Sequence, residues 1–199
     1  MRLPLPQRAQ LGTGALVLAA LAVGQVINAK LPADDVSGRA FEHHVVIDKT
    51  LHMRSGDLTV RSIEGAKSVK RSDGGGFLSP GVIVVVSFDF TSHHQRSSIS
   101  YGELRTTDGG VTTIGPFGDR ANITCPQSQV GILTHCQATV EAAPATLAGA
   151  SLALAPLSID PRFDDMAVID LKITKAMAQE WSKRPGPLDM SQAGADGMP

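Results

Sequence analysis

The sequence predicts an all-β fold, with two packed sheets of about eight short strands behind one apolar N-terminal segment. Three observations point to this class. Short apolar runs with a period of two recur along the chain, glycine and proline are frequent, with 20 and 12 residues, and aromatic residues make up only 4% of the chain. Frequent turn residues between short apolar runs are typical of antiparallel sheets. Without its N-terminal segment and polar tail, the chain of 199 residues has the length of one domain.

An uncharged apolar run, residues 11–29, comes close to the length that spans a bilayer. Arg2 and Arg8 precede it, and positive charge on this side predicts a cytoplasmic N-terminus. Ile27 stands where a signal peptidase site prefers a small residue, which argues against cleavage after Ala29. We therefore expect a single-pass anchor in the cell membrane with an extracytoplasmic domain after it, typical of bacterial envelope proteins. Secretion after cleavage near Ala29 is the alternative.

Polar and turn-forming stretches border the predicted domain on both sides. Pro32, Asp34 and Gly38 lie in a short segment typical of a tether. The end of the chain is rich in Gly, Pro, Asp and Ser, and we expect it to be disordered. The expected organisation is a cytoplasmic n-region at 1–10, an anchor or signal segment at 11–29, a tether at 30–40, a β-sandwich domain at 41–176 and a disordered tail at 177–199.

The clearest strand spans residues 82–90, because every second residue there is apolar and β-branched runs disfavour a helix. Ile83 and Val85 are apolar on the opposite face too, which predicts a central strand. The turn signal Asp108-Gly109 joins two later runs into a hairpin. Such spacing of short strands predicts an Ig-like β-sandwich. The expected strands are 43–48, 58–63, 82–90, 99–104, 111–114, 131–140, 151–155 and 167–173.

The two cysteines, Cys125 and Cys136, are expected to form a structural disulfide, because an extracytoplasmic compartment is oxidising. The loop that they close is short, and its chain-entropy contribution is about 2–3 kcal/mol. The segment Pro126–His135 between them is expected to be the turn of a hairpin or a bent loop clamped at its base. A zinc or redox site is disfavoured, because the spacing is not Cys-x-x-Cys and no ligand cluster completes it.

A family pattern runs through residues 50–175 in the segments Arg54–Val60, Gly81–Phe88, Glu103–Gly110, Val140–Ala150 and Val168–Leu171. In this order the segments resemble the Ig-like extracytoplasmic domains of the DUF4352 type, which are related in fold to a secreted mycobacterial immunogenic antigen. The resemblance implies a lipoprotein-like or membrane-tethered β-sandwich without catalytic residues. Family members are often lipid-anchored through a cysteine after the signal. No cysteine lies near residue 30, so the apolar segment is the expected anchor.

The chain has six histidines, and four of them stand in the adjacent pairs 43–44 and 93–94. Adjacent residues of a strand point to opposite faces, so neither pair chelates a metal as a unit. A cross-strand site with one histidine from each pair and Asp89 or Glu42 is geometrically possible. Because a zinc site needs three or four converging ligands, we expect solvated histidines at strand ends. Near the last strand, the spacing of Asp160, Asp164 and Asp165 does not match an EF-hand, and we expect a solvated loop.

Composition and motifs narrow the function classes. A net charge of -1 provides no field that attracts nucleic acid. Few aromatic residues argue against large platforms for sugars or bases. The sequence holds no Gly-x-Ser-x-Gly motif and no Cys/His pair outside the expected disulfide, so nothing supports nucleophilic catalysis. We therefore expect no enzyme, no metal and no cofactor, and the lipid bilayer as a partner through residues 11–29.

The function expected from the sequence is a non-enzymatic binding or accessory module displayed outside the membrane. It is expected to bind through two loops, the glycine-rich and mobile segment Lys67–Gly76 and the segment Pro126–His135. One alternative is a subunit of a membrane complex, a transporter or envelope assembly, in which small residues such as Gly12 and Gly14 pack the helix against a partner. A less favoured alternative is an exported hydrolase or metal carrier. The candidate binding residues are Lys67, Lys70, Arg71, Asp73, Gln127, Gln129 and His135.

Overall fold

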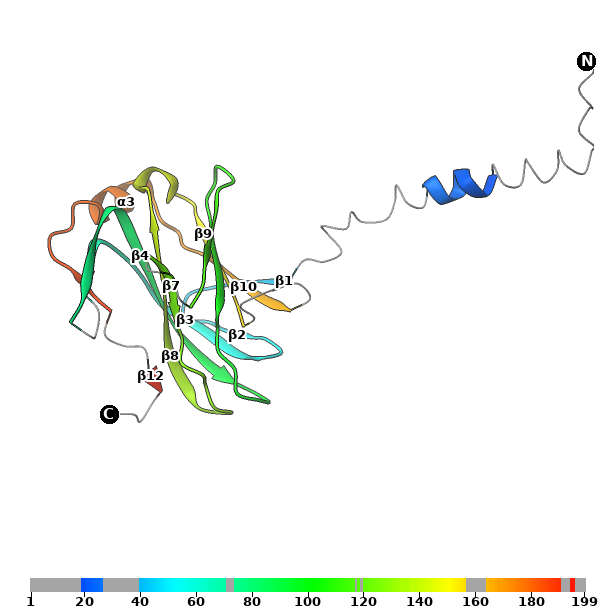
Figure 1. The fold of residues 1–199 in the computed structure, drawn as a ribbon, viewed down its shortest axis with the longest axis horizontal. Helices are drawn as coiled ribbons and strands as arrows, with labels where there is room; N and C mark the ends of the chain where they lie inside the picture. The colour runs from blue at the N-terminus through cyan, green and yellow to red at the C-terminus, as the bar shows by residue number, and fades with distance from the viewer. Residues whose placement is uncertain are drawn as a thin grey trace, which may run out of the picture. The chain divides into compact units, whose positions relative to one another are not determined.

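The structure, a computed structural model, divides the chain into two units, Met1–Arg39 and Ala40–Pro199, which are described separately. In the first unit a helix with exposed residues covers 19–26. The second unit holds the strands and the remaining helices (Figure 1). The described residues are 19–26, 40–70, 74–116, 118, 120–156, 164–190 and 194–195.

The predicted anchor is described only in part. Of residues 11–29, the structure describes 19–26, and the predicted n-region 1–10 lies outside the described residues. Of the predicted tether at 30–40, only Ala40 is described. Within the described ranges, no helix has both the length and the apolar character needed to cross a membrane. The membrane anchor therefore stays a prediction from the sequence.

The second unit is a β-sandwich of two sheets, which confirms the all-β fold class. The elements are β1 Phe41–Val45, β2 Thr50–His52, β3 Gly56–Lys70, β4 Gly76–Ser92, β5 Tyr101–Arg105, β6 Val111–Ile114, β7 Ala121–Thr124, β8 Leu133–Ala142, the 3-10 helix η1 Pro144–Thr146, β9 Ser151–Ala155, β10 Asp165–Asp170, α3 Lys175–Trp181, β11 Leu188–Asp189 and β12 Gly194–Ala195. One five-stranded sheet has the order β1-β10-β9-β5-β6. The seven-stranded sheet has the order β11-β3-β4-β8-β12, with β2 beside β3 and β7 beside β8.

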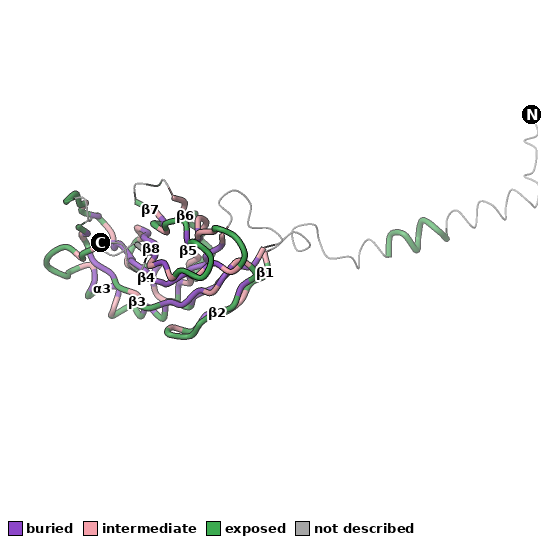
Figure 2. The backbone as a smooth tube through the Cα atoms, turned by 90° about the horizontal axis from the view of Figure 1, so that it is seen from below, coloured by how far each residue is buried: buried purple, intermediate pink, exposed green. Residues whose placement is uncertain are grey.

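The main core lies between the two sheets (Figure 2). Every second residue of β4 from Val82 to Phe90 is buried in it, while Ile83 and Val85 are buried on the opposite face. β4 pairs with β3 on one side and β8 on the other, so its predicted central position is confirmed. Full burial of such a side chain contributes about 1.5–3 kcal/mol, which makes β4 the main support of the fold.

The expectation of a mobile loop over residues 67–76 is wrong for Lys67–Lys70 and Gly76, which lie in strands, while residues 71–73 lie outside the described residues. β3 continues to Lys70 and β4 begins at Gly76, and the two pair antiparallel up to this end. The physical reason is the alternation around Val69, which is buried against Ile83 and Val85 while the lysines beside it point to solvent. The glycine run marks only the connection between the two strands.

The disulfide between Cys125 and Cys136 is confirmed, with an S–S distance of 2.05 Å. β7 pairs antiparallel with β8 from Ala121 opposite Val140 to Thr124 opposite Gln137. The two cysteines follow at the end of this ladder and close the hairpin at its base, as expected from the sequence. Cys136 is buried in the main core, so the disulfide ties the edge strand β7 to the sandwich interior.

Several strand boundaries differ from the expected ones. β1 covers Phe41–Val45 instead of 43–48 and runs parallel to β10. Asp48 has a φ of 61°, which turns the chain at the end of the predicted strand. Likewise, β10 ends at Asp170, and Lys172 has a φ of 50°. The strands β2, β7, β11 and β12 have two to four residues each, too few for an alternating pattern to reveal them.

The predicted disordered tail at 177–199 begins too early. α3 starts after Thr174, whose side-chain oxygen caps the helix, and Trp181 near its end is buried. Its ring lies against Gly65 of β3, where an added Cβ would come within 2.1 Å of the ring. Further on, β11 pairs with β3 and β12 with β8. The segment is polar on average, so its composition does not reveal that Trp181 packs it against the sandwich.

Candidate ligand-binding site

Charged side chains from three adjacent strands meet on the outer face of the seven-stranded sheet. Asp89 of β4 lies directly opposite His135 of β8 in the strand register. The β3–β4 register shifts between Val60 and Ser62, which makes Arg61 the extra residue of a β-bulge. A bulge bends the strand and re-aims the side chain that it carries. Here it brings the Arg61 guanidinium to the carboxylate of Asp89.

Asp89 is the buried centre of this group, with a side chain that is only 7% exposed. Arg61 Nε donates to its Oδ2 at 2.6 Å, and the ring Nδ1 of His135 donates to its Oδ1 at 2.6 Å. A buried carboxylate is costly unless hydrogen bonds and opposite charge compensate it. The Arg61 and His135 side chains are 51% and 44% exposed. The buried carboxylate thus fixes two cation-capable groups in positions that solvent reaches.

These three side chains line a cavity of about 560 Å³, a volume in the range of small-molecule sites. Gln137 of β8 also lines it and donates a long hydrogen bond of 3.4 Å to Ser87 of β4. The lining also includes Ser62, Glu64, Phe88, Cys136 and Asp189. Because most of these groups are polar, the cavity is suited to a polar ligand.

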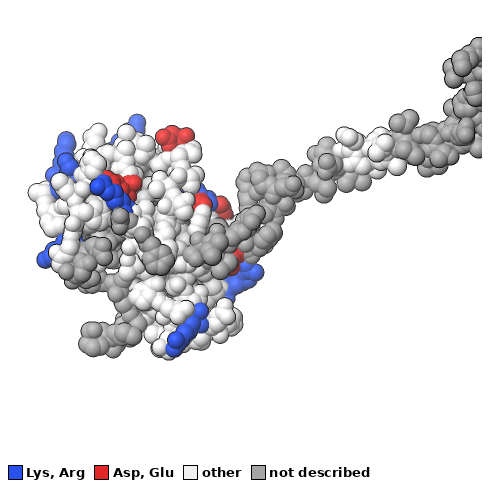
Figure 3. Space-filling view, viewed as in Figure 1, with Lys and Arg blue, Asp and Glu red and all other residues white. Residues whose placement is uncertain are grey.

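Two further carboxylates, Glu64 of β3 and Asp189 of β11, add negative charge to the cavity. Arg184 Nη1 lies 3.8 Å from Glu64, which is too far for a hydrogen bond. Asp189 is exposed, and no ion-pair partner for it is found among the described residues. On the face that Figure 3 shows, the coloured charges are scattered without a large area of one sign. The charge relevant to the cavity is that of the side chains that line it.

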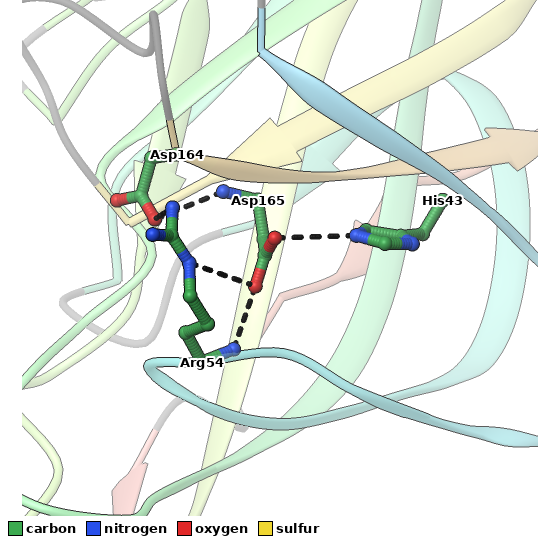
Figure 4. A network of polar contacts seen from close by, with 4 residues as sticks. All are labelled: His43, Arg54, Asp164 and Asp165. Carbon is green, nitrogen blue, oxygen red and sulfur yellow. Dashed lines mark hydrogen bonds and ion pairs between the residues drawn. The ribbon is translucent and has the colours of Figure 1, made fainter.

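A second polar network links the two sheets (Figure 4). Asp165 of β10 accepts hydrogen bonds from the Arg54 backbone N–H at 2.6 Å and from His43 Nε2 at 3.2 Å. Burial acts to raise the pKa of Asp165, but these hydrogen bonds and the nearby positive charge outweigh it, and the pKa lies below its ordinary value. Arg54 Nη2 also donates to Asp164 at 3.2 Å. The network joins β1, the β2–β3 turn and β10, which is a structural role.

The expectation of a solvated loop is therefore wrong for Asp165, which is buried. The aspartate pairs with Arg54, whose sequence position gives no hint of this contact. Asp164 is half-buried, and Asp160 lies outside the described residues.

The histidine pairs do not converge on one site. His43 contacts Asp165, whereas His93 lies 3.0 Å from Asp57, which also accepts a hydrogen bond from His52 at 2.7 Å. Burial acts to raise the pKa of Asp57, but the hydrogen bonds with the two histidines lower it below the ordinary value. In the part of the chain that the structure describes, no group of three or more His, Cys, Asp or Glu has a geometry that could hold a metal ion.

The described residues of the first predicted binding loop do not line the cavity. Lys67 and Lys70 are exposed on β3 and do not line the cavity. Arg71 and Asp73 lie outside the described residues.

The second predicted loop contributes one cavity residue. His135 lines the cavity, but it belongs to β8 and not to the loop. Gln127 and Gln129 are exposed between the disulfide and β8, away from the cavity lining.

Arg61 and Gln137 are site residues that the sequence did not single out, and Asp89 was considered only as a ligand of a metal site beside the histidine pairs. The available signal was the outer face of β4, which changes from apolar Ile83 and Val85 to polar residues at its end. That change marks the point along β4 at which the outer face of the sheet is no longer apolar. The partners of Asp89 follow from the bulge and from the strand register, and neither can be derived from the spacing of residues along the chain.

Comparisons with known proteins add no function. No protein-family model matches the chain, and no curated protein matches it. Among solved structures, the yjhA protein from Bacillus subtilis is similar at 12% identity and a TM-score of 0.42, covering 62% of this chain and 98% of that one. An uncharacterised β-sandwich protein from Clostridium difficile 630 is similar at 12% identity and a TM-score of 0.41, covering 70% of this chain and 98% of that one.

Proposed function

We propose that the protein is a non-enzymatic binding module, held outside the cell membrane by residues 11–29, and that it binds a small polar ligand in the cavity around Asp89. The observation that carries the proposal is the buried carboxylate of Asp89, which holds half-exposed Arg61 and His135 at the wall of an open cavity. Burying an ion pair is weak support for stability. An arrangement that exposes its donor groups to a cavity is suited to recognition.

The extracytoplasmic location in this proposal is supported by two features. The apolar run at 11–29 follows positive charge, and the disulfide between Cys125 and Cys136 is typical of an oxidising compartment. We propose further that the domain is Ig-like and related to the DUF4352-type domains. The order of the segments from Arg54–Val60 to Val168–Leu171 supports this relation.

The test is a map of ligand-induced changes in the protein's own NMR spectrum. The full chain, labelled with ¹⁵N and held in detergent micelles, is titrated with a mixture of free amino acids, dipeptides and monosaccharides. The expected result is a set of saturable shifts on the residues of β3, β4 and β8 that line the cavity, with Arg61, Asp89 and His135 at its centre. The compounds are recovered unchanged.

A matched pair of variants controls for general effects. Arg61→Gln removes the guanidinium from Asp89 and is expected to raise the ligand concentration that saturates the shifts by about tenfold or more. Arg120→Gln removes an arginine that is likewise half-exposed, at 57%, and paired with a carboxylate, that of Glu141 at 2.8 Å, but it lies outside the cavity lining. It is expected to leave the shifts unchanged. Shifts confined to the loop at 126–132 or no saturable shifts would contradict the cavity as the binding site. Chemical conversion of a compound would contradict a non-enzymatic role.

A further inference from the structure

We infer that the ligand of the cavity is a small zwitterion that carries a carboxylate and an ammonium group, of the size of an amino acid or a dipeptide. The inference rests on the proposed function and concerns three charged groups of the cavity lining, the guanidinium of Arg61 and the carboxylates of Glu64 and Asp189. It names a ligand class from the groups that line the cavity.

The carboxylate is assigned to Arg61. The Nε of this guanidinium is occupied by Asp89 at 2.6 Å, and no partner is found for Nη1 and Nη2 among the described residues. Because Asp89 engages Nε, the parallel N–H groups of the outer edge stay available to a ligand in the cavity that Arg61 lines. A planar pair of N–H donors matches the two oxygens of a carboxylate, which makes this edge a strong partner for such a group.

The ammonium group is assigned to the side of Glu64 and Asp189. Both line the same cavity, Glu64 is only loosely placed against Arg184 at 3.8 Å, and Asp189 has no ion-pair partner in the described part of the chain. Since Asp89 already compensates Arg61, these two carboxylates leave the described lining with an excess of negative charge. An ammonium group lowers that excess and offers donors to both carboxylates.

Other ligand classes fit the lining less well. A phosphate or dicarboxylate would satisfy Arg61, but Glu64 and Asp189 would repel its second negative charge. A diamine would satisfy the carboxylates, but it would leave the Arg61 edge facing a cation. A neutral sugar would compensate neither charge. A molecule with one charge of each sign is the class that engages both sides of the cavity.

The test compares three ligands that differ in one charge each. Isothermal titration of the full chain in micelles uses alanyl-alanine, its C-terminal amide, which lacks the carboxylate, and its N-acetyl derivative, which lacks the ammonium group. The expected result is saturable binding of alanyl-alanine and a loss of about tenfold or more in affinity for each derivative, as for a lost charge-assisted hydrogen bond.

Variants assign each charge to its side of the cavity. Arg61→Gln is expected to bind alanyl-alanine and its amide about equally, because the partner of the carboxylate is gone. Arg61→Lys keeps the charge without the paired donors, and it is expected to discriminate only weakly between alanyl-alanine and its amide. Asp189→Asn is expected to reduce discrimination against the N-acetyl derivative. Glu180→Gln on the exposed face of α3 and Arg120→Gln serve as controls that change neither ratio.

The outcomes separate this inference from the proposed function. Tighter binding of the amide or of the N-acetyl derivative than of alanyl-alanine overturns the zwitterion. The same holds if alanyl-alanine does not bind while other compounds of the mixture shift the residues of the cavity, and in that case the binding module stands. If no compound shifts the cavity residues, the proposed function fails and the inference fails with it.

Discussion

Arg61 and Asp89 differ in how well water can hydrate each charged group when the other is removed. Asp89 is buried, so its carboxylate loses a compensating partner at a position with little contact with water when Arg61 is removed. Arg61 is half-exposed, so its guanidinium can be hydrated when Asp89 is removed. The energetic consequences of the two removals are therefore unequal.

We expect Arg61→Gln to lower the free energy of unfolding by about 2–4 kcal/mol, because it leaves a buried charge with one partner fewer. Asp89→Asn is expected to lower it by about 1–2 kcal/mol, since an amide is less costly to bury. Urea unfolding of the full-length variants at neutral pH measures both. Arg120→Gln is the reference, because Arg120 is exposed to a similar extent and also pairs with a carboxylate, that of Glu141. An equal loss for the two variants would show that Asp89 is hydrated after Arg61 is removed.

Asp165 makes stability depend on acidity. Its pKa in the folded protein lies below the ordinary value of 3.8. The unfolded chain therefore takes up the proton first as the pH falls, and the stabilisation, present above 3.8, is lost as the pH drops through the lower folded value. We expect the stability difference between the wild type and Asp165→Asn to be constant from pH 7 to about pH 5 and to shrink toward pH 2. Denaturant unfolding at each pH measures it, and a difference that grows with acid would refute the assignment.

At the level of elements, the strength of a repeated pattern decides what the sequence reveals. β4 could be predicted because both of its faces carry an apolar pattern over many residues, and only a central strand buries both. The β7–β8 hairpin could be anticipated from Cys125 and Cys136, because an exported pair at this spacing closes a local loop. The bulge at Arg61 and the pairing of β1 with β10 could not, since they depend on contacts between residues far apart in the chain.

The docking of α3 shows the same limit at the C-terminal end. The segment is polar enough to be read as a tail, yet Trp181 fits against Gly65 of β3. One aromatic side chain and one glycine carry the contact, and a composition average does not register either of them. The packing of α3 against β3 should therefore require that position 65 has no side chain.

We expect Gly65→Ala to lower the free energy of unfolding by about 1–3 kcal/mol, because the new methyl group overlaps the indole ring. The chain has one tryptophan, so a red-shifted fluorescence maximum of the folded variant would report that Trp181 has left its site. Gly115→Ala is the control, since nothing lies within 4 Å of its added Cβ. An unchanged spectrum together with unchanged stability would contradict the contact.

At the level of the whole molecule, we propose a membrane anchor followed by a binding domain. The residues that bear on membrane attachment, 11–29, are separated in the chain from the cavity residues of β3, β4 and β8. We therefore expect membrane attachment and ligand binding to depend on different segments. A variant can then lose one of the two and keep the other.

We expect the full chain to sediment with membranes and to be released by detergent but not by high salt, because an apolar segment and not surface charge holds it. A variant with Leu16, Leu18 and Leu21 replaced by Asp is expected to lose membrane association, since each charge is costly in the bilayer. Intact mass of the membrane fraction is the companion measurement. A mass that begins near Lys30 would show a cleaved signal and a released protein.

Filling the cavity around Asp89 with a larger side chain tests whether the ligand binds there. Ser87 lines the cavity from β4, so Ser87→Phe places a ring in the space that the ligand would occupy. Thr113→Phe, on the exposed part of β6 in the other sheet, is the matched control. Titration with the mixture of amino acids, dipeptides and monosaccharides is expected to show binding to the wild type and the control, and binding weaker by about tenfold or more in Ser87→Phe. Equal affinities in all three proteins would contradict the account.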